Sequence, residues 1–195
     1  MITQQQRIWL SQLSDTKLVE ILPYDKKAPE KFRKLKTRLR GVLGNQYNVL
    51  LKGAAGLGIS GKGELDIFVP VSPDLFDITV NLVKQLLGPP ESHYQSERAR
   101  FNTVIDGTEA EVFVINDETE GWRNGLKFEN YLLNNPKYLE QYRCLKEAAQ
   151  TTSVREYYRH KIEFINEILM LAGQRDISTS QLAPGKGSGY DTENE

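Results

Sequence analysis

The pattern of apolar and polar positions along the chain predicts a short sheet set between helical segments. Apolar residues recur at helical spacing over residues 3–13, 29–43 and 74–87, and again over 122–133, 136–149 and 154–172. Short apolar runs predict strands at 49–51, 64–69, 101–105 and 110–115. The order of helix, mixed sheet and helical C-terminal part favours an α+β fold.

Turn and cap residues set the expected boundaries of these elements. Asp106-Gly107 separates two apolar runs, which is typical of a tight hairpin. We expect Pro70 to close the strand over 64–69. Ser153 is the predicted N-cap of the last helix. Within strand 64–69, alternation should bury the apolar side chains against helix 74–87.

The same pattern predicts how the chain is divided. We expect an N-terminal helix over residues 1–18, an α/β core over 19–120 and a C-terminal helical part over 121–172. Residues 173–195 are rich in Gly, Ser, Asp and Gln and lack periodicity, so a disordered tail is predicted there. The 195 residues suit one domain with a small appendage.

Composition removes several classes of protein. A single cysteine, Cys144, excludes an internal disulfide framework and a cysteine-based zinc cluster, and two distant histidines make a histidine-rich zinc site a poor hypothesis. No apolar run approaches the roughly 20 residues of a membrane helix. The polar N-terminus lacks the order of a secretory signal, so we expect a cytoplasmic protein without membrane contact. Carboxylates are the plentiful reactive groups.

Basic residues are concentrated near the N-terminus although the net charge is only −1. The segment from Lys26 to Arg40 is rich in Lys and Arg, and Glu30 is its one acidic residue. Such a helix could face phosphates of a nucleotide or nucleic acid, or a protein partner. A solvated helix face would show the same pattern.

The most informative stretch joins a glycine-rich loop, residues 53–63, to the strand at 64–69. Glu64 and Asp66 alternate with apolar residues, so both carboxylates should lie on one face. Carboxylate pairs are natural ligands of Mg²⁺ that bridges nucleotide phosphates. The loop can supply backbone N–H groups to phosphates, and Lys62 can add a point charge. An exposed strand face without a ligand remains the alternative.

A third carboxylate is expected from the second arm of the hairpin. Glu109 and Glu111 both lie on the polar face of that strand, and Glu111 lies deeper in the apolar run. Alternation does not choose between them. The glycine-rich loop is not a P-loop, because Lys62 is followed by Gly63 and then by a strand, and for the same reason it is not a Rossmann fingerprint.

These residues resemble a known superfamily. Gly53-Ala54, a short gap and then Glu64-Leu65-Asp66-Ile67 resemble the signature of the DNA polymerase β-like nucleotidyltransferases. More of the chain, about residues 19–172, resembles one branch, the GrpB family. The segments that carry this resemblance are Val19-Glu20-Ile21-Leu22-Pro23-Tyr24-Asp25, Pro29-Glu30-Lys31-Phe32, Phe128-Glu129-Asn130-Tyr131-Leu132, Asn135-Pro136 and Tyr142-Arg143-Cys144-Leu145-Lys146, followed by Tyr157, Lys161, Phe164 and Ile165.

The resemblance implies a nucleotidyltransferase-like mixed sheet with flanking helices and a cleft toward the C-terminal helices. There a nucleoside triphosphate would bind with Mg²⁺, and its nucleotidyl group would pass to an acceptor hydroxyl. Glu64, Asp66 and Glu111 would be the catalytic and metal-binding residues. The nucleotide-binding residues would be Gly53, Ala54, Ser60, Lys62, Lys146, Tyr157 and Lys161. The alternative for the last three is that the tyrosine packs and the lysines are solvated.

The chain also departs from its relatives. Ala54 stands where the superfamily has a serine that helps to hold the triphosphate, and Lys52 stands at a position that is usually apolar. Glu109-Ala110-Glu111 replaces a His-x-His pair common in the GrpB family, and Glu64 replaces an apolar residue. The carboxylates favour a metal-dependent enzyme. Ala54 favours a non-catalytic nucleotide-binding or protein-interaction module on the same fold.

Overall fold

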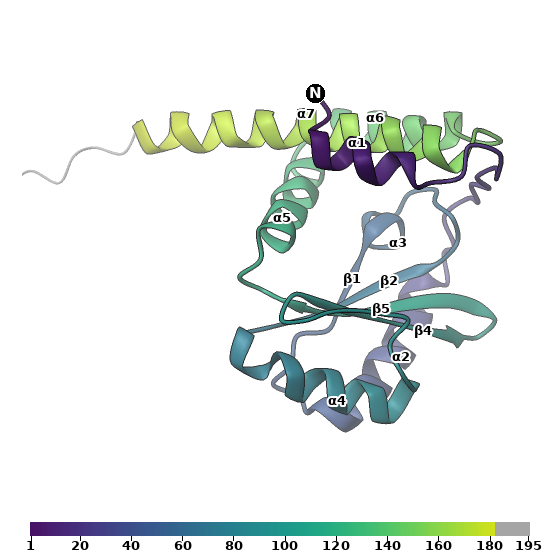
Figure 1. Cartoon of the computed structure of the whole chain (residues 1–195), viewed down its shortest axis with the longest axis vertical. Coiled ribbons are helices and arrows are strands. Elements are labelled where there is room, and N and C mark those ends of the chain that lie inside the picture. Colours follow the sequence, from purple (N-terminus) through teal and green to yellow (C-terminus); the bar gives the residue numbers. More distant parts are fainter. Residues whose placement is uncertain (182–195) are drawn as a thin grey trace, which may run out of the picture.

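The chain forms a five-stranded mixed sheet with two helices on one face and a layer of C-terminal helices on the other (Figure 1). In this computed structural model residues 1–181 are described, with side chains to residue 173. The strand order is β1-β2-β5-β4-β3. The strands are β1 (Leu50–Lys52), β2 (Leu65–Val71), β3 (Ser92–Tyr94), β4 (Arg98–Ile105) and β5 (Thr108–Asn116). Strand β2 is parallel to β5, and the other pairs are antiparallel, so the predicted α+β class is confirmed.

Helices α2 (Ala28–Leu43) and α4 (Phe76–Leu87) cover one face of the sheet. Leu65, Ile67 and Val69 of β2 are buried there in one cluster with Val80 and Val83 of α4, as the alternation predicts. We call this the core face. A short 3₁₀ helix, Pro73–Leu75, precedes α4 and takes up the first part of the helix expected over 74–87. Burial of the apolar side of β2 fixes its polar side toward the C-terminal helices.

The C-terminal helices are α5 (Glu120–Leu133), α6 (Pro136–Ala148) and α7 (Val154–Gln181). They share a second cluster that includes Phe128, Leu132, Tyr142 and Ile168. Helix α5 rises from the sheet to this layer, and α6 and α7 lie across its top (Figure 1). The Ser153 hydroxyl accepts a hydrogen bond from the Glu156 N–H, as expected of an N-cap.

Several boundaries differ from those expected. Strand β2 continues through Pro70 to Val71, because β1 pairs only with residues 66–68 and the proline lies where that side of β2 has no partner. The start of the glycine-rich loop is a helix, α3 (Gly53–Leu57), which packs on β1 and β2. Helix α7 continues past Gly173 to Gln181, the last described residue, because one glycine costs a helix only about 1 kcal/mol. The rest of the expected disordered tail, residues 182–195, lies outside the described residues.

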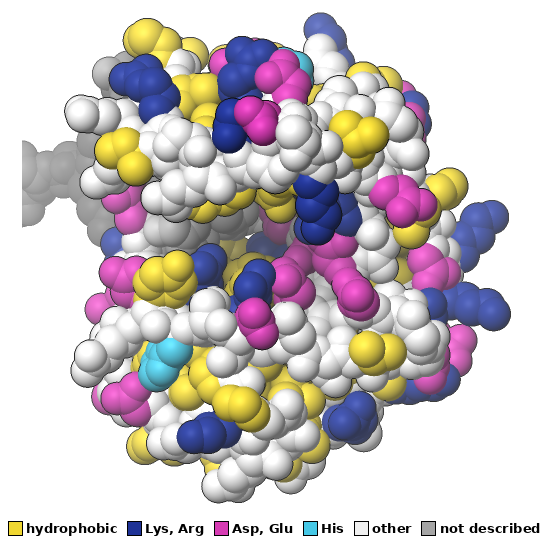
Figure 2. Space-filling model, turned by 45° about the vertical axis from the view of Figure 1, so that its right-hand side comes forward, with side chains coloured by type: hydrophobic (Ala, Val, Ile, Leu, Met, Phe, Trp, Pro, Cys, Tyr) yellow, Lys and Arg dark blue, Asp and Glu magenta, His cyan; other side chains and the backbone are white. Residues whose placement is uncertain are grey.

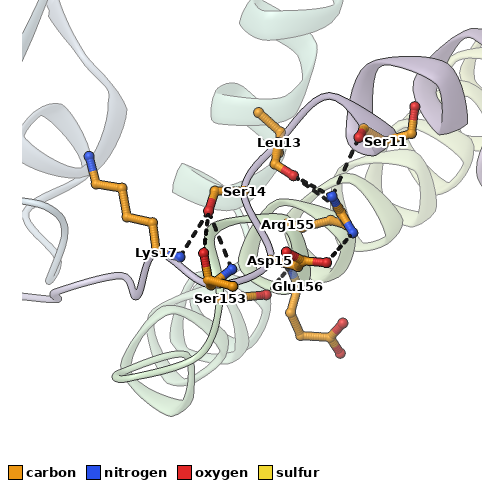
Figure 3. A network of polar contacts seen from close by, with 9 residues as sticks. Ser11, Leu13, Ser14, Asp15, Lys17, Ser153, Arg155 and Glu156 are labelled. Atoms are coloured by element: carbon orange, nitrogen blue, oxygen red, sulfur yellow. Dashed lines mark hydrogen bonds and ion pairs between the residues drawn. The ribbon is translucent and has the colours of Figure 1, made fainter.

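An N-terminal clasp, residues 4–22, joins α7 to the glycine-rich loop. Helix α1 (Gln4–Ser11) contacts α7. The Arg155 guanidinium donates to the carbonyls of Ser11 and Leu13 and pairs with Asp15 at 2.8 Å (Figure 3). Further along, Leu22 exchanges backbone hydrogen bonds with Gly61. The clasp therefore holds one side of the C-terminal layer in place over the sheet.

Helix α2 carries the basic segment, part of whose charge is neutralised. Lys31 pairs with Asp25 at 2.7 Å, and Lys34 pairs with Glu30 at 3.2 Å and with Asp106 at 2.7 Å. A contact of this helix with nucleic acid stays a prediction. Among residues 1–181, none of the helices has the length and apolar character to cross a bilayer.

Candidate functional site

The face of the sheet opposite the core face, which we call the cleft face, carries the candidate carboxylates. Glu64 precedes β2 directly, and Asp66 is its second residue. In register, Asp66 lies between Lys52 of β1 and Glu111 of β5. The fold thus brings together Asp66 and Glu111, which are 45 positions apart in the sequence. The neighbour of Asp66 is therefore Glu111, and Glu109 is exposed.

Two of the three carboxylates are already paired with cations. Glu64 Oε1 lies 2.8 Å from Lys62 Nζ, and Glu111 Oε1 lies 3.0 Å from Arg100 of β4. Lys62 therefore neutralises a carboxylate here, in addition to any contact with phosphate. Within residues 1–181, no group of three or more His, Cys, Asp or Glu side chains is arranged to hold a metal ion by itself.

Asp66 is the most perturbed carboxylate of the site. Burial and then the charge of Glu64 raise its pKa from 3.8 to about 6, and Glu111 raises it further while Lys161 and Lys62 lower it. A carboxylate held among like charges is a favourable place for an added cation. A strongly shifted pKa in a cleft is also a general mark of functional sites.

Gly53 lies against Asp66 and needs to be glycine. Its φ is +64°, and a Cβ at this position would collide with the Asp66 carboxylate. The Gly53 N–H donates to Glu129 Oε1 at 3.1 Å. The other Glu129 oxygen pairs with Lys52, whose side chain is 12% exposed. The first N–H of α3 is thus satisfied by a side chain of α5.

The Lys52–Glu129 pair is the part of the site that sequence reasoning missed. Glu129 stood among the residues that carry the family resemblance, and Lys52 was noted only as an unusual residue at an apolar position. The pair joins β1 to α5 across the cleft. The signal in the sequence was a lysine at a position that is usually apolar, because a buried lysine needs an acidic partner elsewhere in the chain.

Two lysines of the C-terminal layer reach toward Asp66. Lys146 is only 5% exposed, and burial, then Lys161, lower its pKa from 10.5 to about 8, while Asp66 and Glu64 act in the opposite direction. Its Nζ lies 5.2 Å from the centroid of the Tyr142 ring. Lys161 lines the cleft with Asp66. Two neighbouring ammonium groups on one side and carboxylates on the other suit a ligand that carries phosphates together with a cation.

The other predicted nucleotide-binding residues have packing roles in the structure. Tyr157 is 1% exposed and belongs to a cluster with Val19 and Ala149. Ser60 is buried, and its hydroxyl donates to Glu147 at 2.7 Å. Ala54 packs against the cluster of the C-terminal helices. Ala54 and Glu64 also line a separate pocket of about 180 Å³.

A larger pocket opens between the sheet and α5. Its volume is about 290 Å³, and Asp66, Gly53 and Lys161 are among the residues that line it. Figure 2 shows charged side chains of both signs gathered around a hollow between the two halves of the molecule. The aromatic residues that line the rest of the pocket are Phe68, Phe113, Trp122, Phe128 and Tyr142.

The donor set fits Mg²⁺ that arrives with a phosphate ligand. Magnesium keeps several waters and is usually held by one or two carboxylates together with substrate phosphates, so a complete cage of side chains is not required. Asp66 and Glu64 would supply carboxylate oxygens, and burial and then the charge of Glu64 raise the pKa of Asp66. Glu111 would join them only in a state in which its ion pair with Arg100 is open.

Comparison with known proteins gives the same family as the sequence signature. The family model described as GrpB protein matches residues 18–170. The crystal structure of the conserved protein GrpB from Enterococcus faecalis matches with a TM-score of 0.62 at 22% identity, covering 80% of this chain and 98% of that chain. No curated protein matches. Helix α1 precedes the matched residues.

Proposed function

Because the chain belongs to the GrpB family, we propose that it binds a nucleoside triphosphate with Mg²⁺ in the cleft and transfers the nucleotidyl group to an acceptor hydroxyl. This is the reaction class of the superfamily that the motif from Gly53 to Asp66 resembles. The fold shared with GrpB from Enterococcus faecalis supports the architecture.

The observation that carries this proposal is the electrostatic setting of Asp66. Its pKa is raised to about 6 by burial and by Glu64, with Glu111 beside it on β5. Lys146 and Lys161 approach from the opposite side, and burial lowers the pKa of Lys146. A bound phosphate would stabilise the charged form of the buried Lys146 amine, and a bound cation would stabilise the charged carboxylates.

The residues have separate tasks in this reaction. Glu64 and Asp66 would hold Mg²⁺, with Glu111 as the third carboxylate, and the metal would supply positive charge to the phosphates. Lys146 and Lys161 would bind phosphate oxygens as point charges. The acceptor oxygen forms a bond to the α-phosphorus while the bond to pyrophosphate breaks, and the hydroxyl proton passes to a neighbouring carboxylate oxygen.

A second candidate is a nucleotide-binding module without catalysis. Ala54 lacks the hydroxyl that would hold the triphosphate, and both Glu64 and Glu111 are occupied by ion pairs. A site that keeps these pairs when nucleotide binds would leave the metal with Asp66 alone. Binding and transfer therefore have to be measured separately.

The experiment is a panel of the four ribonucleoside triphosphates with and without Mg²⁺. Thermal unfolding reports binding, since a ligand at 100 times its dissociation constant adds about 2.7 kcal/mol of stability. Pyrophosphate release in the presence of candidate acceptors reports transfer. Stabilisation that requires Mg²⁺ and is lost in Asp66→Asn supports the proposal, whereas stabilisation unaffected by Mg²⁺ and by Asp66→Asn supports the second candidate. No stabilisation by any triphosphate contradicts both.

A further inference from the structure

Helix α1 contacts α7 beside the lysine that α7 contributes to the cleft. Trp9 of α1 and Tyr158 of α7 form a T-shaped ring pair, with centroids 5.3 Å apart at 86°. Lys161 follows Tyr158 by three residues, a spacing that places both side chains on one face of the helix. The Nζ of Lys161 lies 5.4 Å from the centroid of the Tyr158 ring. Tyr158 therefore connects α1 to Lys161, which lines the cleft with Asp66.

The Tyr158 ring is held by further contacts. It packs against the buried Tyr157 ring, with centroids 5.0 Å apart at 66°. Tyr158 also adjoins the cluster that contains Val19, Ala149 and Tyr157. Val19 belongs to the N-terminal clasp, so the clasp borders Tyr158 through α1 and again through the segment that follows it. These contacts fix the aromatic surface on which Lys161 lies.

Lys161 depends on this surface for its position. In the part of the chain that the structure describes, no carboxylate forms an ion pair with Lys161, whereas Lys52 and Lys62 each pair with a glutamate. A lysine side chain is long and flexible, so ordering it when a ligand binds costs free energy. A cation over an aromatic face is attracted by the ring. The Tyr158 ring therefore orders Lys161 before a ligand arrives.

Helix α1 lies outside the part of the chain that the family model matches, residues 18–170. It buries little apolar surface, since Leu10 is its one buried residue and Trp9 is 43% exposed. Its place on α7 is nevertheless specific, because the side chains of Gln6 and Asn166 exchange hydrogen bonds of 3.0 and 3.2 Å. The contact of Trp9 with Tyr158 is thus a defined result of this docking.

We propose that Trp9 and Tyr158 are positioning residues, which hold Lys161 at the cleft ready to bind phosphate oxygens. This inference rests on the proposed function and extends its site to α1. A lysine that is ordered in advance has less conformational entropy to lose on binding. The affinity for a polyanion should therefore depend on a tryptophan that does not itself line the cleft pocket.

The first experiment measures the position of Lys161 without any ligand. The protein is acetylated with an N-hydroxysuccinimide ester, and mass spectrometry gives the rate at which each lysine reacts. Trp9→Ala should raise the rate at Lys161 about threefold, because the amine spends less time on the ring. The rate at Lys146, which lies over the Tyr142 ring instead, is the internal reference and should not change. Ile8→Ala is the matched control, since Ile8 is a neighbouring residue of α1 and is 55% exposed.

The second experiment measures the binding of inorganic tripolyphosphate with Mg²⁺ by calorimetry. Trp9→Ala and Tyr158→Leu should each weaken binding about threefold, and Trp9→Phe, which keeps a ring, should restore most of the affinity. In Lys161→Met, adding Trp9→Ala should cause no further loss, because both changes remove the same contact. Trp9→Leu keeps apolar bulk on α7 without a ring, so it replaces Trp9→Ala where the alanine variant unfolds.

The outcomes separate this inference from the proposed function. Losses from Trp9→Ala and Lys161→Met that add together overturn the positioning role, and so does tighter binding in Trp9→Ala, which would show that the ring holds Lys161 away from the ligand. Unchanged labelling and unchanged affinity in the Trp9 variants overturn it as well, but leave the proposed function intact. A parent protein that binds neither tripolyphosphate nor any nucleoside triphosphate contradicts the proposed function and, with it, the phosphate-binding role of Lys161.

Discussion

The two faces of strand β2 divide the work of the molecule. On the core face, Ile67 and Val69 are fully buried against two helices. On the cleft face, Asp66 and Phe68 border an open pocket, and the charge of Asp66 is held at a cost that its raised pKa records. The side chains of the core face are packed entirely within the protein. On the cleft face, a buried charge and part of an apolar surface lack a partner inside the protein. The difference shows where stability is produced and where a ligand would gain the most.

The largest expected effect tests the core face. Ile67→Ala should lower the free energy of unfolding by about 3 kcal/mol, because it removes buried methyl groups and leaves a cavity. Phe68→Leu, the next residue on the other face, should cost clearly less. Urea denaturation of both variants measures the difference. If Phe68→Leu proves as costly as Ile67→Ala, the division between the two faces is wrong.

The second effect has the opposite sign. In the protein without ligand, Asp66→Asn should raise the free energy of unfolding at pH 7 by on the order of 2 kcal/mol, because the variant no longer holds a charge whose pKa burial has raised. The folded pKa of about 6 exceeds the ordinary 3.8, so the neutral carboxyl is favoured in the fold. The parent should therefore lose stability relative to the variant as the pH rises from about 4 to about 6.

Unfolding of the parent and of Asp66→Asn across this pH range is the measurement. A loss of more than about 2 kcal/mol in Asp66→Asn at pH 7 would mean that the carboxylate is a structural hydrogen-bond acceptor. The non-catalytic function would then be favoured.

A third effect distinguishes two carboxylates on one strand. Glu111→Gln should reduce the stabilisation by Mg²⁺ with nucleoside triphosphate, since Glu111 is the register partner of Asp66. Glu109→Gln is the matched control, because Glu109 is exposed and pairs in register with Val104. Thermal shifts of the two variants with ligand decide between them. A larger loss in Glu109→Gln would transfer the third carboxylate to that residue.

The smallest effect is expected on the outer surface of α2. Lys34→Met removes exposed ion pairs with Glu30 and Asp106, which solvent and salt screen. Its unfolding midpoint should lie within the error of the parent value. A clear drop in the unfolding midpoint would show that the basic helix contributes to stability. Surface contacts would then matter as well as the core face of β2, contrary to our expectation.

Local pattern was enough to predict the two faces of β2. Alternation placed Ile67 with the core and Asp66 opposite it, and Asp106-Gly107 located the hairpin whose second arm, β5, carries Glu111. These features depend on residues close in sequence, or on one turn. The GrpB family was also predicted from the sequence and is confirmed by the family model.

The features that sequence did not predict depend on contacts between distant segments. Glycine-rich residues favour a loop at 53–57, but packing on β1 and β2 makes them a helix. Pro70 was expected to end a strand, and only the short length of β1 explains why the strand continues. The Lys52–Glu129 pair joins two elements whose approach no local pattern encodes. Strand β3 consists of Ser, His and Tyr, so no run of apolar residues marks it in the sequence.

The N-terminal clasp has a consequence for the order in which the chain folds. Arg155 binds carbonyls of residues 11 and 13, more than 140 positions earlier in the sequence. During synthesis, α1 leaves the ribosome long before its partner helix α7 exists. Closing so long a loop has a large entropic cost, which slows the formation of the contact. The sheet can assemble first, from hairpins and neighbouring strands. The clasp then forms as a late step, and the completed cleft appears only when the last helix has arrived.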